Sequence, residues 1–243
     1  MVPAALTDGI LNGSWNKQKR WEFCRMRTIK HAVVSMAGFG SRLGKNLPKG
    51  LVELGSHRLV WYLLQVTRNI PDLRIVVGFK AQEVIDYVKT IRPDVNFILN
   101  SDYASTSCAY SIDLGSRDLT EPFLIIDGDL LLVPDSFQEF VSECEKTSRT
   151  LVGVTPAKTE QAVFAETNDE DGTIRGFTRT PGSKWEWSGV AFVDFPIDPQ
   201  ERFICDTLAK KLPLKYHPIQ CFEIDTPADH ELAQNYLRSI ESY

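Results

Sequence analysis

The chain has 243 residues, of which 43% are apolar, and its formal net charge is −5. This length supports one large hydrophobic core and leaves little room for a second full domain. The acidic balance argues against a nucleic-acid surface, which needs a basic stripe. No apolar run approaches the roughly 18 residues that would cross a bilayer. We therefore expect no nucleic-acid partner and no membrane span.

Five cysteines and four histidines are dispersed along the chain. An odd number of cysteines without a C-x-x-C pair is typical of reduced thiols, so we expect a cytoplasmic protein without a disulfide framework. The scattered histidines show no zinc-site spacing. Residues 1–27 have no apolar period and are interpreted as a weakly ordered extension, or as a segment upstream of a natural start at Met26. Residues 28–243 are then expected to be a single domain.

The first half of the chain alternates short apolar runs with amphipathic stretches. Continuous apolar runs are typical of parallel strands that are covered on both faces. The pattern predicts strands at 29–37, 73–79, 95–99 and 122–126, and helices at 58–69, 81–90, 106–114 and 135–146. This alternation predicts a doubly wound, mostly parallel sheet with right-handed crossovers and helices on both faces.

The second half changes character. Strands are predicted at 151–155, 163–166, 174–178, 189–193 and 220–224, with a helix at 200–211 and a turn at the NDEDG segment, 168–172. The last helix is expected to open at Thr226, with Thr226 as its cap, Pro227 in its first turn and Asp229 at its positive end. The fold class predicted for the whole chain is therefore α/β, a mixed sheet with a small β annex in the second half.

A glycine-rich segment, MAGFGSRLGKNLPK at 36–49, follows the first predicted strand. Gly38 and Gly40 alone fit a tight turn equally well. With Arg42 and Lys49 added, the segment predicts a triphosphate site, because glycines let backbone N–H groups approach phosphates and the two cations neutralise them. The third glycine of a dinucleotide fingerprint is missing, and the spacing is not that of a Walker loop.

The run AGFGSRLGKNLPK resembles the G-x-G-x-R…P-K loop that opens the nucleotidyltransferase superfamily, which includes sugar-1-phosphate, inositol-phosphate and phosphocholine members. The resemblance extends from about residue 30 to the end of the chain. It implies that Arg42 and Lys49 are catalytic and that the loop binds the nucleotide. The loop residues with that expected role are Ala37, Gly38, Phe39, Gly40 and Ser41.

Two acidic segments are candidate metal sites. Asp127-Gly-Asp129 ends the fourth predicted strand, where ligands of parallel sheets bind, although Asp and Gly also favour a plain turn there. Asp225 precedes the last helix, where an acid also favours the helix dipole. The family resemblance implies that Asp129 and Asp225 are the Mg²⁺ ligands, with Asp127 as a neighbouring acid. A shared ion requires their carboxylates to lie within roughly 4–5 Å of each other.

The stretch NSDYASTSCAYS at 100–111 resembles the N-x-x-Y-x-x-T-N…S-L segment of phosphocholine and aminoethylphosphonate cytidylyltransferases. The resemblance places Thr106 and Ser107 at the base or ribose, and we expect Tyr110 near the acceptor. Thr106 is equally well explained as a helix N-cap. Ser107-Cys108 replaces the usual asparagines, which leaves the base and acceptor open.

The segment KWEWSG at 184–189 is a candidate acceptor site. Trp185 and Trp187 are candidates for an aromatic cage around a quaternary ammonium, with Glu186 as its counter-ion. An ordinary strand that packs one Trp inward explains the segment as well. Lys158 is a candidate contact for the acceptor phosphate, and a solvated surface lysine is the alternative.

These features together predict a Mg²⁺-dependent nucleotidyltransferase. It would join an NTP, with CTP favoured, to a small phosphorylated acceptor and release pyrophosphate. The acceptor is expected to be phosphocholine-like, a phosphonate, a polyol phosphate or a sugar phosphate. The main alternative is a glycosyltransferase that uses Asp127-Gly-Asp129 as its D-x-D motif, and a silent nucleotide-sensing subunit ranks last. The sequence does not predict the oligomeric state.

Overall fold

The computed structural model describes residues 29–40, 46–147, 149–158 and 162–241. The expectation for residues 1–27 lies outside these ranges. Within them, the apolar runs of the first half form four parallel strands in the order β5-β4-β1-β6. These strands are β1 (His31–Met36), β4 (Asp72–Val77), β5 (Asn96–Leu99) and β6 (Phe123–Asp127).

The second half continues the same sheet. Strand β11 (Trp185–Val193) runs antiparallel to β6 and to β8 (Leu151–Pro156), and it also pairs with β9 (Phe164–Asn168). Strands β12 (Leu214–Pro218) and β10 (Thr173–Thr178) complete the sequence of pairs β11-β8-β12-β10-β9-β11. The annex is therefore a ring of five strands that shares β11 with the main sheet. The α/β class, the mixed sheet and the annex predicted from the sequence are confirmed.

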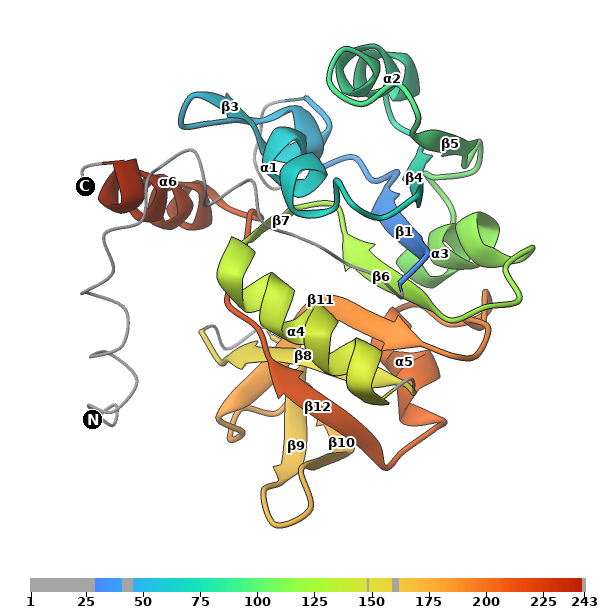
Figure 1. Cartoon of the computed structure of the whole chain (residues 1–243), viewed down its shortest axis with the longest axis vertical. Coiled ribbons are helices and arrows are strands. Elements are labelled where there is room, and N and C mark those ends of the chain that lie inside the picture. The colour runs from blue at the N-terminus through green and yellow to red at the C-terminus, as the bar shows by residue number, and fades with distance from the viewer. Residues whose placement is uncertain (1–28, 41–45, 148, 159–161, 242–243) are drawn as a thin grey trace.

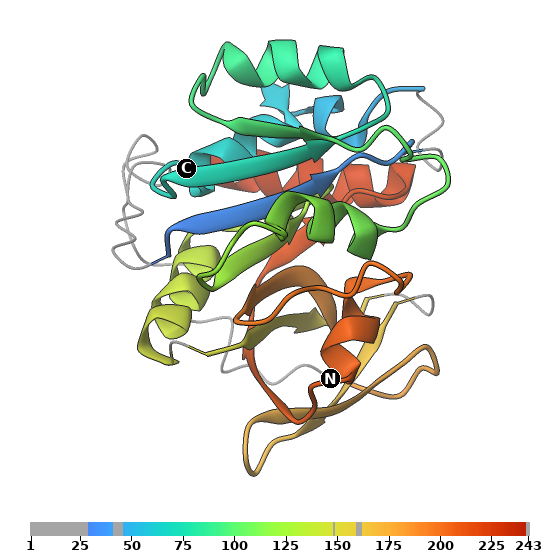
Figure 2. The ribbon, with the colours of Figure 1, turned by 90° about the vertical axis from the view of Figure 1, so that its right-hand side faces the viewer.

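Helices cover both faces of the sheet, because alternate residues of the buried strands point to opposite sides. Helices α1 (Leu59–Val66), α2 (Ala81–Lys89) and α4 (Pro134–Thr147) enclose one core, and α3 (Cys108–Ser116) and α5 (Ile204–Ala209) enclose the other. In β1, for example, Val34 faces the first core and Val33 the second. Helix α2 lies at the top of both ribbon views and the β9–β10 hairpin at the bottom (Figures 1 and 2).

Three short elements build the edge where the parallel strands end. Strand β7 (Leu130–Leu132) pairs antiparallel with β13 (Cys221–Glu223), and the 3-10 turn η3 (Lys49–Leu51) follows the glycine-rich segment. The hairpin β2 (Glu53–Leu54)–β3 (His57–Arg58) and the last helix, α6 (Pro227–Glu241), meet in a third apolar cluster. Thr226 and Asp229 cap α6 reciprocally, since Thr226 Oγ1 donates to Asp229 Oδ2 at 2.8 Å and accepts from the Asp229 N–H at 3.3 Å. The predicted start of this helix is confirmed.

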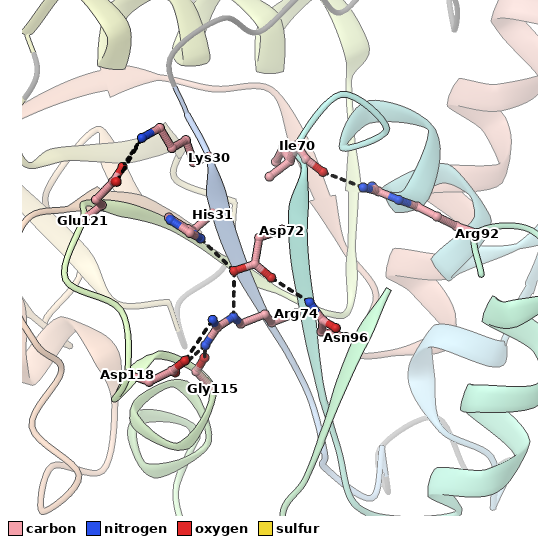
Figure 3. Close-up of polar contacts among 10 residues, drawn as sticks. All are labelled: Lys30, His31, Ile70, Asp72, Arg74, Arg92, Asn96, Gly115, Asp118 and Glu121. Atoms are coloured by element: carbon pink, nitrogen blue, oxygen red, sulfur yellow. Dashed lines mark hydrogen bonds and ion pairs between the residues drawn. The ribbon is translucent and has the colours of Figure 1, made fainter. Parts of the chain in front are cut away.

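The opposite edge of the sheet, where β1, β4 and β5 begin, is joined by polar side chains (Figure 3). Asp72 accepts hydrogen bonds from Arg74 Nε at 2.9 Å and Asn96 Nδ2 at 2.9 Å, and its Oδ2 lies 2.7 Å from His31 Nδ1. Arg74 also forms a two-pronged pair with Asp118. These contacts tie the starts of three strands to the connection between α3 and β6. They lie away from the site described next.

Candidate active site

The glycine-rich segment turns sharply after β1 and leads to Lys49. Gly40 has a φ of +61°, and a Cβ at this position would lie 2.8 Å from Lys49 Cγ and 3.3 Å from the Leu47 carbonyl oxygen. Only glycine combines this backbone conformation with so close an approach. Gly38 and Phe39 are exposed beside it, and the Ala37 carbonyl accepts from the Phe79 N–H at 3.0 Å. Ser41 and Arg42 lie outside the described residues, so their predicted roles stay predictions.

Lys49 reaches from η3 to both predicted metal ligands. Its Nζ lies 2.6 Å from Asp129 Oδ2 and also hydrogen-bonds Asp225 Oδ1. The side chain is 17% exposed. Burial opposes its charged form, but the negative charges of Asp129 and Asp225 and their hydrogen bonds raise the pKa of Lys49 above its ordinary value. Lys49 is therefore a charged ammonium clamped between two carboxylates.

Asp129 and Asp225 meet because short strands pair beside them. Asp129 immediately precedes β7, Asp225 follows β13 by two residues, and the Ile224 N–H donates to the Asp129 carbonyl at 2.9 Å. One oxygen each from Asp129, Asp225 and Glu223 lie within 4.8 Å of one another. The close approach that the sequence predicted for Asp129 and Asp225 is found. Their role as ligands stays a prediction.

Glu223 is a member of the site that the sequence reasoning missed. It is the most exposed of the three acids, yet loss of hydration around its carboxylate and the charges of Asp129 and Asp225 raise its pKa to about 8. Its position two residues before Asp225 was the available signal, because it places a third acid in the same short segment, Glu223-Ile-Asp225. Three carboxylates in reach of one another form an all-oxygen donor set, which suits a hard divalent cation such as Mg²⁺.

Asp127 lies beneath this cluster at the end of β6. Burial and the charge of Asp129 raise the pKa of its carboxyl to about 7. Cys108 Sγ lies 3.4 Å from Asp127 Oδ1 and 3.4 Å from Ser35 Oγ, and Trp187 also hydrogen-bonds Asp127. Burial and the neighbouring Asp127 raise the pKa of Cys108 well above its ordinary value, so it is present as the thiol. The sequence reasoning attached no role to Cys108.

The predicted base-binding stretch is held by an internal polar network. Asn100 is 2% exposed, and its Nδ2 donates to Thr106 Oγ1 at 2.9 Å and Ser111 Oγ at 3.0 Å. Ser107 caps α3, because its Oγ accepts from the Tyr110 N–H at 3.0 Å, and it also donates to the Glu201 carbonyl at 2.7 Å. The helix cap is thus Ser107, one residue after Thr106. Tyr110 hydrogen-bonds Arg117 at the far end of α3.

The predicted acceptor residues lie near one another in the annex, but on opposite sides of β11. Glu186 accepts from the Lys158 N–H at 3.0 Å, and Lys158 Nζ donates to the Cys221 carbonyl at 2.6 Å beside the Phe222 ring. Trp185 and Trp187 pack on the other side of β11, within the core of α3 and α5. The alternation along β11 therefore separates Glu186 from both rings, and the three side chains do not form one cage. Lys158 is an exposed lysine whose ammonium is hydrogen-bonded to β13.

Known proteins support a nucleotidyltransferase fold. The model of the MobA-like NTP transferase domain matches residues 32–199. A GlmU bifunctional protein from Aquifex aeolicus is 35% identical over 108 residues, which are 42% of this chain and 22% of that protein. One from Pseudarthrobacter chlorophenolicus is 26% identical over 152 residues, which are 59% of this chain and 31% of that protein. The chain thus spans less than a third of these curated relatives.

Solved structures share the fold over most of the chain. The CTP:phosphocholine cytidylyltransferase LicC from Streptococcus pneumoniae has a TM-score of 0.71 at 23% identity, over 86% of this chain and 100% of that one. The inositol-1-phosphate CTP transferase from T. maritima has a TM-score of 0.68 at 19% identity, over 86% and 96% of the two chains. A UDP-glucose pyrophosphorylase complexed with UDP-glucose reaches 0.73 at 17% identity, over 87% and 99%. Among the described residues, no helix is both long and apolar enough to span a membrane.

Proposed function

Because this chain belongs to the MobA-like NTP transferase family, we propose that it transfers a nucleoside monophosphate from CTP to a small phosphorylated acceptor. The observation that carries the proposal is the position of the Lys49 ammonium against Asp129 and Asp225, with Glu223 beside them. A cation and a divalent-metal donor set at one point, next to an exposed glycine turn, suit the transfer of a charged phosphoryl group. The family works on NTPs, which argues against the glycosyltransferase alternative.

The donor set fits Mg²⁺, which Asp129, Glu223 and Asp225 would hold. When bound, Mg²⁺ neutralises phosphate oxygens and helps to orient the nucleotide. The backbone N–H groups from Ala37 to Ser41, with Arg42, would hold the triphosphate tail. Lys49 stabilises the negative charge that accumulates on the α-phosphate.

The reaction needs little further chemistry from the protein. An oxygen of the acceptor phosphate forms a bond to the α-phosphorus, and the bond from that phosphorus to the bridging oxygen of the β-phosphate breaks. Pyrophosphate leaves with the bonding electrons. A phosphate dianion is already a nucleophile, so no general base is required, and positioning and electrostatics supply the acceleration.

CTP and the acceptor classes are proposed on three grounds. Two proteins with the same fold act on CTP with phosphocholine or inositol-1-phosphate, according to their names. The stretch around Asn100 and Thr106 resembles the corresponding segment of phosphocholine and aminoethylphosphonate cytidylyltransferases, with Ser107-Cys108 in place of the usual asparagines. On the acceptor side, Lys158 and Glu186 lie next to β13, which carries Glu223, and these charged groups suit an acceptor that bears both a phosphate and a polar or cationic group.

A substrate matrix tests the proposal. CTP, UTP, ATP, GTP and dTTP are each mixed with phosphocholine, 2-aminoethylphosphonate, a polyol phosphate, inositol-1-phosphate and glucose-1-phosphate in the presence of Mg²⁺. We expect pyrophosphate release with CTP and one acceptor class. Release with another NTP would overturn the choice of CTP. Failure of every pair, together with hydrolysis or transfer from a nucleotide sugar, would overturn the reaction itself.

A further inference from the structure

One ammonium group bridges two carboxylates from distant parts of the chain. Lys49 Nζ lies 2.6 Å from Asp129 Oδ2 and hydrogen-bonds Asp225 Oδ1 at the same time. The three side chains are only 12% to 19% exposed, so solvent screens this contact weakly. The bridge is therefore a close, partly buried triad of one positive and two negative charges.

The same carboxylates are the donors of the proposed divalent-cation site. The oxygens of Asp129, Glu223 and Asp225 that approach one another lie within 4.8 Å, a span that a single ion with bonds of about 2.1 Å can bridge. An ammonium between Asp129 and Asp225 competes for this position. A divalent ion and the Lys49 ammonium would repel each other if both shared those two carboxylates.

We infer that Lys49 is a resident counter-cation of the site: its ammonium neutralises Asp129 and Asp225 in the metal-free protein and leaves them when a divalent ion binds. The inference deepens the proposed function, on whose metal site it rests. It assigns Lys49 two successive partners, first the carboxylates and then the phosphate of the nucleotide.

The local structure lets the ammonium move without the backbone. The Val52 N–H donates to the Lys49 carbonyl at 3.0 Å and fixes η3. The Lys49 side chain runs past Gly40, where a Cβ would lie 2.8 Å from Lys49 Cγ. Rotation of the outer methylene groups therefore keeps the ammonium at the glycine turn, where the triphosphate is proposed to lie.

Two consequences distinguish this role from a merely structural ion pair. A divalent ion alone binds more weakly than the three carboxylates would allow, because Lys49 must first be displaced. A nucleotide offers the displaced ammonium a new partner, so metal and nucleotide bind with positive coupling, and each raises the affinity for the other by the same factor. An ion pair that only stabilises the fold would give neither effect.

Binding of Mn²⁺ measured by electron paramagnetic resonance, without nucleotide, tests the inference. We expect Lys49→Met and Lys49→Gln to bind Mn²⁺ roughly 5- to 150-fold more tightly than the wild type, the usual range for coupled sites. Lys49→Arg, which keeps the charge, should resemble the wild type. Lys80→Met is the matched control, because Lys80 is the N-cap of α2 and pairs with Glu83 of the same helix at 3.5 Å. Thermal unfolding of each variant verifies that it is folded.

A second titration includes the α,β-methylene analogue of CTP. The analogue should tighten Mn²⁺ binding to the wild type and have a much smaller effect on Lys49→Met. Unchanged or weaker Mn²⁺ binding by both neutral variants would overturn the inference. In that case the proposed function can still hold. It stands if Asp129→Asn abolishes Mn²⁺ binding and the wild type releases pyrophosphate from CTP. If the wild type neither binds Mn²⁺ nor releases pyrophosphate with any substrate pair, both fail.

Discussion

The Ile224 N–H donates a hydrogen bond to the Asp129 carbonyl at 2.9 Å, and this bond extends the pairing of β7 with β13 to the two metal-ligand candidates. Asp129 lies immediately before β7, and Asp225 lies two residues after β13. The pairing of these two strands therefore fixes the separation of the two acids. Backbone pairing, together with the Lys49 bridge, holds these carboxylates near each other. Substitutions of the carboxylates should therefore affect chemistry more than folding.

Replacement of Asp129 by Asn should lower kcat/KM by about 100-fold or more, by analogy with other groups that stabilise transition-state charge. The amide keeps the size of the side chain but removes a charge that Lys49 contacts. Pyrophosphate release measures the loss, and thermal unfolding measures stability. Asp86→Asn, on the exposed side of α2, is the control and should retain wild-type activity. Near-normal turnover of Asp129→Asn with Mg²⁺ would show that this carboxylate is not part of the site.

Gly40→Ala should reduce kcat by about 100-fold, because the added Cβ would displace Lys49 from its position and small misplacements are costly. The backbone strain alone costs about 1–2 kcal/mol of folding free energy. Gly172→Ala is the matched control: its φ of +63° imposes similar strain in the β9–β10 turn, and its nearest neighbour is the Lys215 ammonium at 3.9 Å. Equal activity losses in the two variants would mean that strain, and not the position of Lys49, explains the effect.

Asn100→Ala should raise the KM for the nucleotide more than it lowers kcat. It removes the bonds to Thr106 Oγ1 and Ser111 Oγ that shape the predicted base-binding stretch, and the unsatisfied groups should cost about 1–3 kcal/mol of stability. Steady-state kinetics with varied CTP and urea unfolding separate the two effects. Asn96→Ala removes an amide bond to Asp72 at the opposite edge of the sheet and should leave the KM unchanged. An unchanged KM in Asn100→Ala would remove this stretch from the nucleotide site.

Asp72 should make the stability of the fold sensitive to acid. Burial opposes ionisation of its carboxyl, but hydrogen bonds with His31, Asn96 and Arg74 more than offset this and lower its pKa in the folded protein (Figure 3). A lowered folded pKa means that ionised Asp72 adds stability above its unfolded pKa of about 3.9. That contribution is lost as the pH falls through the folded value.

Urea unfolding of the wild type and of Asp72→Asn at pH 7 and near pH 3 tests this expectation. The variant should be less stable at pH 7 by about 1.5–3 kcal/mol, the range for hydrogen bonds to charged groups. The difference should shrink at the lower pH, because the pH has then fallen below the unfolded pKa and approaches the lowered folded pKa. A difference that stays constant between the two pH values would assign the loss to packing and not to ionisation.

The sequence predicted the main framework because its strands are continuous apolar runs and its helices have one apolar side. It missed β12, where Leu214 is the only buried residue of the strand and the others are partly or fully exposed. It also started β11 too late: the strand was predicted from 189 but begins at Trp185, because its first residues pair with β8 and β9 in the annex. Such long-range pairing leaves little local signal.

The site was predictable where a motif names a residue type at a fixed place. Lys49, Asp129 and Asp225 fall in such motifs, and the structure gathers them. Glu223 was missed because an acid on a short strand resembles a solvated surface residue until β7 is seen beside it. Ser107 contacts Glu201, 94 residues later, and Lys158 contacts Cys221, 63 residues later. Contacts between such distant residues cannot be predicted from a local sequence pattern.

Strand β11 belongs to both the main sheet and the annex. A shift of this strand in one region therefore also shifts its pairing in the other. Its later residues pair with β6, while Trp185 and Glu186 pair with β8 and β9. A one-residue slip of β11 would turn Trp187 away from Asp127 and reverse every inward and outward side chain along the strand. Changes in chain length are therefore best placed in the connecting loop at 179–184, where they leave the shared strand in register.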